Sequence, residues 1–342
     1  MMRKTVWVLM AAVLLAVGAW AQYNHTGNMY QPGYATDNFE GFEAFGVDDR
    51  IQQKTESFWF SVSADDAAGQ LAYAREKLAR EHLRGARKGF EALVREWPTA
   101  PEAALAQLEL AQLYEKRKKY SRAFDEYQYL LTFYAGVCPY DEVLSRQFKI
   151  ANFLLHDNVS IFGWELSGTE SVRKRFELIV RNAPTSPIAP QAMLIVGSIR
   201  TADKEVDEAI KVYDGLLNRY GETEQAADAA YLSAKCRYDR SSKNAYNEAN
   251  CRDAISFLRA VTTRMPRHPQ IAEMTGWLAA LSTQLEEQCY QNALFYDTKQ
   301  RNRQAALMAY KSFLREFRES KYAEQVRKRV EELETKQGVS KE

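Results

Sequence analysis

The chain has 342 residues, and its 46 basic and 45 acidic side chains leave a formal net charge of +1. This balance gives no overall attraction to nucleic acid or to an anionic membrane, so a nucleic-acid-binding role is not expected. Apolar residues make up 46% of the sequence, which is enough for extensive helix-on-helix packing.

The first 21 residues are expected to be a secretory signal peptide. Arg3 and Lys4 precede an apolar run over residues 5–18, and small residues at 19 and 21 stand where a signal peptidase cuts, before Gln22. The run is shorter than the roughly 20 residues that a membrane-spanning helix needs. Export with cleavage is therefore the favoured interpretation, and an uncleaved anchor is the alternative.

Residues 22–64 are expected to form an extended or disordered leader. They lack a helical period and are rich in Gly, Asn, Asp and aromatic residues. Within them, Phe58, Trp59 and Phe60 are three adjacent aromatic residues, which seldom stay in water without a surface to contact. One interpretation is a cap over the exposed face of the first helix, and the other is contact with a partner or a membrane.

From residue 65 onward the sequence repeats one pattern, in which a small residue precedes an aromatic or large apolar residue by four positions and a proline follows eight later. The complete copies are Ala86, Phe90 and Pro98; Val172, Phe176 and Pro184; and Ala254, Leu258 and Pro266. Three further copies keep the first two positions: Ala123 and Tyr127, Ala209 and Tyr213, and Ala306 and Tyr310. Such self-similarity is the signature of a helical solenoid.

Each position of the pattern has a physical reason. A small side chain lets the second helix of a pair approach the first closely, and the residue four places later lies on the same face and fills the gap beyond it. The proline ends the helix because it has no N–H to donate. The sequence therefore predicts pairs of antiparallel helices.

These signals predict one all-α domain over residues 65–335, built from about six helix pairs and a C-terminal capping helix, followed by a disordered tail at 336–342. The helices with explicit expected bounds are 65–81 and 83–97, 102–116 and 120–134, 142–155, 271–297 and 303–317, and the last at 321–334. Inserted loops are expected at 136–141, 156–170 and 241–250, where the repeat spacing lengthens.

The four cysteines are Cys138, Cys236, Cys251 and Cys289, and none of their spacings matches a metal-ligand pair. In an exported protein Cys236 and Cys251 are the best candidates for a disulfide, because they would lie on the two helices of one hairpin. The alternative is that all four are buried small hydrophobic residues.

No catalytic, cofactor-binding or metal-binding constellation is recognisable. The four histidines are scattered along the chain, and the sequence has neither a phosphate-cradling glycine loop nor a metalloprotease motif. The charge run at 115–119 is interpreted as a helix end, where the helix dipole favours its cations. An enzyme is not expected, although catalytic groups from distant parts of a chain would escape this test.

Three stretches carry a resemblance to a known family. They are FEALVREWPTAPEAALAQLELA from Phe90, AFDEYQYLLTFY from Ala123 and ALMAYKSFLREFRESKYAE from Ala306. In addition, Leu110, Ala111 and Tyr114 have the spacing of a tetratricopeptide first helix. Over residues 65–333 the chain resembles the BamD family of periplasmic tetratricopeptide-repeat proteins, which serves outer-membrane β-barrel assembly. It departs from that family in having no cysteine at the expected cleavage site for a lipid anchor.

The resemblance implies a noncatalytic periplasmic scaffold near the outer membrane, without cofactors. It also implies that early repeats receive unfolded outer-membrane protein segments and that later repeats dock the barrel-forming subunit. A cell-envelope adaptor of the Tol-Pal/CpoB type is the runner-up, and a wall-acting enzyme is a third class. Position in the first helices selects the candidate groove residues, for which ordinary packing is the alternative: Leu71, Arg75, Leu78, Leu108, Gln112 and Lys116.

Overall fold

A computed structural model describes residues 62–160, 169–243 and 247–338. The predicted signal peptide, nearly all of the predicted leader with Phe58, Trp59 and Phe60, and the end of the predicted tail lie outside the described residues. Within the described part, every regular element is an α-helix and no strand is present. The all-α prediction is confirmed.

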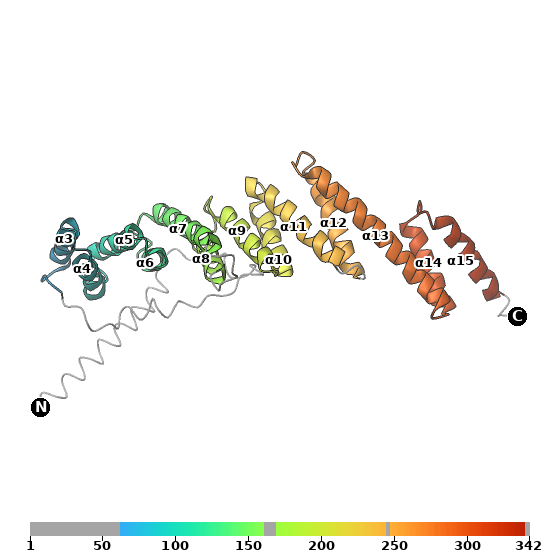
Figure 1. The fold of residues 1–342 in the computed structure, drawn as a ribbon, viewed down its shortest axis with the longest axis horizontal. Coiled ribbons are helices and arrows are strands. Elements are labelled where there is room, and N and C mark those ends of the chain that lie inside the picture. The colour runs from blue at the N-terminus through green and yellow to red at the C-terminus, as the bar shows by residue number, and fades with distance from the viewer. Residues whose placement is uncertain (1–61, 161–168, 244–246, 339–342) are drawn as a thin grey trace, which may run out of the picture. The chain divides into compact units, whose positions relative to one another are not determined.

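The thirteen helices of the described residues form six consecutive pairs and one last helix (Figure 1). The pairs are α3 (Ala67–Ala79) and α4 (Leu83–Glu96); α5 (Pro101–Lys116) and α6 (Tyr120–Phe133); α7 (Tyr140–Ser160) and α8 (Thr169–Asn182); α9 (Ala189–Ala202) and α10 (Val206–Tyr220); α11 (Glu224–Lys243) and α12 (Glu248–Arg264); and α13 (Ile271–Thr298) and α14 (Arg303–Glu316). The last helix is α15 (Ala323–Gly338).

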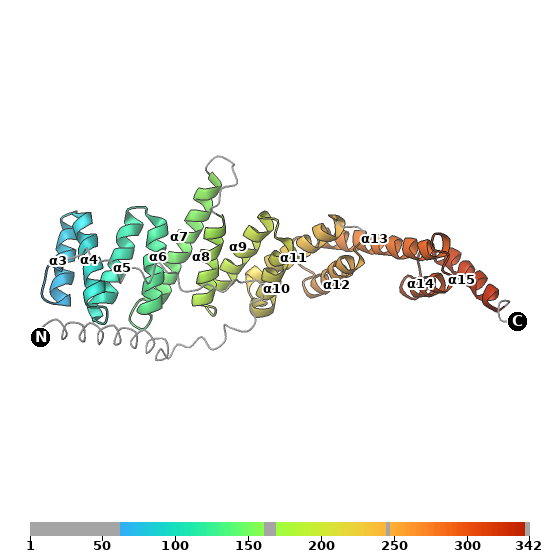
Figure 2. The ribbon, with the colours of Figure 1, turned by 90° about the horizontal axis from the view of Figure 1, so that it is seen from below.

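Every two consecutive helices from α3 to α15 pack against each other, as the two views in Figures 1 and 2 show. Some first helices of successive pairs also touch, namely α3 with α5, α9 with α11, and α11 with α13. Contacts between neighbours in sequence are what distinguish a stacked array from a globular core. The predicted α-solenoid of six pairs and a terminal helix is therefore confirmed.

The core lies between the helices, at the positions that the repeat pattern selects. In all six second helices the small residue and the large residue four places later are buried, with at most 2% of either exposed. The largest fully buried side chains include Phe90, Tyr127, Phe176 and Tyr213, all from this pattern. The array is thus held together by one buried ring or leucine per pair, set against a small neighbour.

The prolines end the second helices as expected. Helices α4, α8 and α12 stop two residues before Pro98, Pro184 and Pro266. Two of these turns are also tied to the following pair, because the Tyr134 hydroxyl donates to the Pro98 carbonyl and the Tyr220 hydroxyl donates to the Pro184 carbonyl. The turn after each of these two helices is therefore hydrogen-bonded to the end of the next second helix.

The loops are shorter than the sequence pattern predicted. Helix α7 already begins at Tyr140 and continues to Ser160, and helix α11 reaches Lys243 before α12 starts at Glu248. The repeat spacing shows that residues have been added, but it does not show whether they form a loop or lengthen a helix. Residues 156–160 and 241–243 contain no glycine or proline, so the added residues extend helices.

Helix α13 is 28 residues long and belongs to two cores. Its first half contributes Met274, Leu281 and Leu285 to a cluster with α11 and α12. Its second half contributes Tyr290 and Ala293 to a separate cluster with α14 and α15. One long helix that takes a second helix on each half accounts for the wide spacing between Leu258 and Tyr310.

Candidate functional site

The first helices α3 and α5 lie side by side and present a partly apolar surface. Leu105 is 46% exposed, and Leu108 and Gln112 follow it at helical spacing and are half-buried. At the border with α3, the Arg75 guanidinium lies 2.5 Å from the Glu109 carboxylate. We name Leu105, Leu108 and Gln112 the α5 face; it combines exposed aliphatic surface with a polar amide next to an ion pair.

The structure separates the predicted groove residues. Leu71 is only 5% exposed and packs in the core, so it is unavailable to a partner. Leu78 is half-buried, whereas Arg75 and Lys116 are exposed. Leu105 was missed by sequence reasoning, because α5 carries apolar residues on most sides and its sequence does not show which of them stays exposed.

A second recurring feature is a polar contact between pairs. The residue after the buried ring of a second helix contacts a residue 23 positions later, in the next first helix. The contacts are Glu91 with Tyr114, Glu177 with Arg200, and Asp214 with Arg237. They link successive pairs, and the spacing would have been visible in the sequence only to a reader who already knew the geometry.

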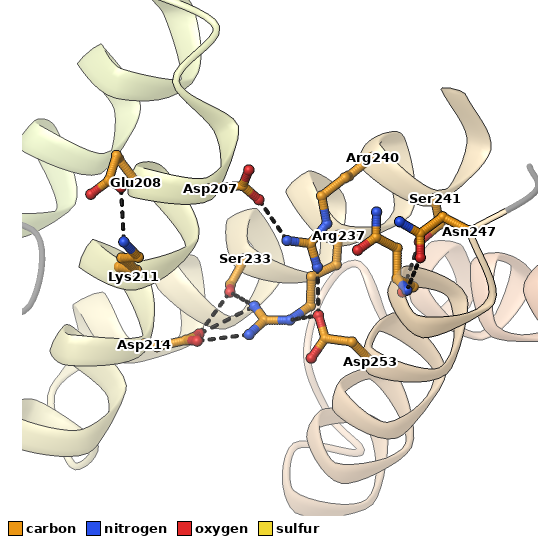
Figure 3. A network of polar contacts seen from close by, with 11 residues as sticks. Asp207, Glu208, Lys211, Asp214, Ser233, Arg237, Arg240, Ser241, Asn247 and Asp253 are labelled. Atoms are coloured by element: carbon orange, nitrogen blue, oxygen red, sulfur yellow. Dashed lines mark hydrogen bonds and ion pairs between the residues drawn. The ribbon is translucent and has the colours of Figure 1, made fainter. Parts of the chain in front are cut away.

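The most extensive of these contacts connects α10, α11 and α12 (Figure 3). The Arg237 guanidinium lies 2.7 Å from Asp214 on α10 and 3.1 Å from Asp253 on α12, and 4.1 Å from the centre of the Phe257 ring. Arg240, one turn on, lies 2.7 Å from both Asp207 and Asp253. Two arginines of one helix therefore join the helices on either side of it, which is a structural role.

We expect Arg237→Met to lower the free energy of unfolding by about 1–2 kcal/mol. Arg237 is 6% exposed, but its partners Asp214 and Asp253 are partly open to water, which limits the penalty for leaving them unpaired. The measurement is the urea midpoint. Arg264→Met is the control, because that side chain is 62% exposed and pairs with an exposed Glu222 at 3.6 Å. Equal losses in the two variants would contradict the assigned role of Arg237.

Comparison with family models identifies the repeat type. Residues 71–137 match the tetratricopeptide repeat model, from within α3 to just beyond α6. The first two helix pairs are tetratricopeptide repeats. The later tetratricopeptide-like pairs follow the same order of a first helix, a second helix with a small and a large buried residue, and a turn.

Solved structures with a similar arrangement include a tetratricopeptide repeat protein from Parabacteroides merdae ATCC 43184, with 13% identity, coverage of 78% of this chain and 98% of that one, and a TM-score of 0.29. Another is the C-terminal part of a tetratricopeptide repeat-containing protein from Cytophaga hutchinsonii. It has 14% identity, the match covers 81% of this chain and 92% of that one, and the TM-score is 0.31. A third is YrrB, a tetratricopeptide protein with an unusual peptide-binding site. It has 14% identity, the match covers 62% of this chain and 92% of that one, and the TM-score is 0.29. No curated protein matches the sequence.

Potential metal ligands are spread through the described part of the array. No group of three or more His, Cys, Asp or Glu side chains in it is placed to hold a metal ion. Burial raises the pKa of the Tyr127 and Tyr213 hydroxyls, so neither ionises near neutral pH. Among the helices that the structure describes, none is both long and apolar enough to cross a bilayer.

The predicted disulfide is absent. Cys236 and Cys251 are both free and buried, and they face opposite neighbours in the tetratricopeptide array. The Cys236 sulfur lies 3.6 Å from the Thr201 hydroxyl on α9, whereas the Cys251 thiol donates to the Leu281 carbonyl on α13 at 3.5 Å. Membership of one helix hairpin therefore did not bring the two sulfurs together, and the alternative of buried hydrophobic cysteines holds for this pair.

We expect the denatured, unreduced protein to contain four titratable thiols. In the native Cys138→Ser variant, Cys289 is the one partly exposed thiol of the described residues, and burial raises its pKa to about 11. Its labelling by a disulfide reagent should be slow at pH 7 and accelerate about tenfold per pH unit through pH 9, since only the thiolate reacts. A rate that levels off near pH 8.5 would contradict this environment, and two thiols instead of four would restore the disulfide.

Proposed function

We propose that this protein is a noncatalytic scaffold that binds segments of other polypeptides through the α5 face and the adjoining surface of α3. The observation that carries the proposal is the exposure of Leu105 beside the half-buried Leu108 on the first helix of a tetratricopeptide repeat. Helical repeat arrays use the surface of their first helices to hold extended or helical segments. Aliphatic side chains there would contact apolar residues of a segment, and Gln112 and the Arg75–Glu109 pair would contact its polar groups.

We further propose that the scaffold works in the periplasm, in the assembly of outer-membrane β-barrel proteins. The support is the signal-peptide pattern of residues 1–21 and the resemblance of the repeat phrases to the BamD family. Its partners would be unfolded outer-membrane protein segments and the barrel-forming subunit of the assembly machinery. Contact with the membrane through those partners would keep it near the outer membrane.

The α5 face is tested with the double variant Leu105→Gln/Leu108→Gln. Burying the exposed parts of two leucines contributes about 1.5–2 kcal/mol, so we expect binding of a fluorescent unfolded β-barrel segment to weaken by about tenfold or more. Met308→Gln is the matched control, because this methionine is 67% exposed on a second helix, α14. Anisotropy titrations in which the two variants weaken binding equally, or not at all, would contradict the assignment of the surface.

The identity of the partner is tested separately, by crosslinking in envelope fractions and identification of the captured proteins. A photoreactive amino acid at position 105 should capture unfolded outer-membrane proteins, and one at position 308 should not. Consistent capture of Tol-Pal or wall-synthesis proteins at position 105 would replace the assembly role with that of an envelope adaptor. Turnover of peptidoglycan fragments by the purified protein would contradict a noncatalytic role.

A further inference from the structure

The second helices of the first two pairs, α4 and α6, begin with positive charge, which the helix dipole disfavours at that end. Neither α4 nor α6 has an acidic residue in its first turn, and these turns carry Arg84 and Arg122. The start of a helix favours anions and disfavours cations. The array follows that rule elsewhere, since α8, α10 and α12 all have acidic residues in the first turn. Helix α14 has none, but its Arg303 is used to bond the Leu333 carbonyl.

The turn between α5 and α6 adds four consecutive cations. Lys116, Arg117, Lys118 and Lys119 are all exposed, and none of them forms an ion pair with a described residue. The dipole accounts for the cations that end α5, but not for Lys119, which stands at the N-cap of α6. With the two exposed cations of α4 and the one in the first turn of α6, these residues make up what we name the basic edge: Arg84, Lys88, Lys116, Arg117, Lys118, Lys119 and Arg122.

Tyr114 fixes the three helices of the basic edge around one point. Its hydroxyl lies 3.4 Å from the Glu91 carboxylate on α4, and the Arg122 guanidinium on α6 lies 5.9 Å from the centre of its ring. Tyr114, near the end of α5, therefore contacts the middle of α4 and the first turn of α6, and Figure 2 shows the three helices next to one another. Cations that are up to 38 positions apart in the sequence thus gather at the same end of adjacent helices.

An aromatic pair lies directly beside this charge. Tyr120, which follows Lys119 as the first residue of α6, has its ring centre 4.2 Å from that of Phe153 on α7. Phe153 remains 45% exposed despite this contact. Lysines with aromatic side chains next to them are the combination found where proteins rest on the headgroup region of a bilayer.

We propose that the basic edge is a docking surface for an anionic phospholipid membrane. The cations lie on the first halves of α4 and α6, at the end of α5 and in the turn between α5 and α6, and most are lysines, which act as flexible point charges. The net charge of +1 conceals this surface, because attraction to lipid headgroups falls off within about 10 Å and depends on local charge. The proposal is independent of polypeptide binding by the α5 face.

The test is flotation of the full exported protein with phospholipid vesicles. We expect binding to vesicles with about 30% phosphatidylglycerol, no binding to phosphatidylcholine alone, and loss of binding as salt rises from about 0.1 M to 0.5 M. The variant R84Q/R117Q/K118Q/K119Q should bind at least about tenfold more weakly. The control R259Q/R264Q/R267Q/R315Q removes the same net charge at exposed positions elsewhere and should bind within about twofold of the parent.

Equal weakening in both quadruple variants, or unchanged binding in the first, would overturn the proposal. It would also be overturned if the parent bound a poly-glutamate peptide more tightly than the anionic vesicles, since the edge would then serve an acidic polypeptide. Circular dichroism of each variant separates a binding defect from unfolding. Binding of the unfolded β-barrel segment should be unchanged in R84Q/R117Q/K118Q/K119Q, so failure of this proposal and failure of the scaffold function give different results.

Discussion

The Phe176→Ala variant is expected to lose about 3–5 kcal/mol of stability in the region of the third and fourth pairs. Phe176 is completely buried on α8, and its ring meets Phe148 of α7 edge to face, with 5.8 Å between the ring centres. Removal of the ring forfeits its transfer free energy and leaves a cavity between two helices that are fixed by their other contacts. The urea midpoint followed by far-UV circular dichroism measures the loss.

Phe153→Ala is the matched control, because Phe153 lies on the neighbouring helix α7 and is 45% exposed. It should cost no more than about 1 kcal/mol, mostly from the contact with Tyr120. In a repeat array, a local loss of stability can also split the unfolding transition into two steps. An additional step at low urea in Phe176→Ala, but not in Phe153→Ala, would therefore also indicate that the core around Phe176 has been weakened. Similar midpoints for the two variants would contradict the assignment of Phe176 to the core.

The Gly197→Ala variant is expected to lose about 2–3 kcal/mol, because a side chain at this position overpacks the core. A Cβ atom on Gly197 of α9 would lie 2.4 Å from the ring of Tyr213 on α10. That ring is itself completely buried, so it has no free space to move into. The backbone of α9 or the ring must shift, and thermal and urea midpoints should both fall.

Gly276→Ala is the same substitution at a position where the added methyl group meets open space, so it serves as the control. Gly276 lies inside α13, and a Cβ atom there would meet nothing within 4 Å. Alanine in an exposed helix interior should stabilise the protein by up to about 1 kcal/mol relative to glycine. Changes of the same sign in the two variants would show that the close approach at Gly197 is not what limits substitution.

The sequence predicted the fold correctly at positions where the residue type and its spacing allow only one structural role. Phe90, Phe176 and Tyr213 were assigned to the core from their spacing to a small residue, and all are fully buried. The proline stops were equally reliable, because a proline that follows the last turn has no N–H with which to continue the hydrogen bonds of the helix. Loop lengths were not predictable in this way, because residues added between repeats extend a helix or a loop depending on local propensity.

The candidate site was less accessible to prediction for a physical reason. Leu71 and Leu105 both lie on first helices, but the first is buried and the second is exposed, because the rotation of each helix is set by its neighbours. The disulfide prediction failed similarly, since a shared hairpin fixes the helices of Cys236 and Cys251 but not the direction of either thiol. The partner-binding roles of Arg75, Leu78, Leu108, Gln112 and Lys116 stay predictions.

The double membership of α13 has a mechanical consequence. Under a pulling force applied to the two ends of the described array, a helix that is anchored in one core can be released without disturbing the next. Helix α13 is anchored in two, so its 28 residues are held until both clusters give way. An optical-trap trace should therefore show the last two pairs yielding together, as one long extension step, with single pairs released elsewhere.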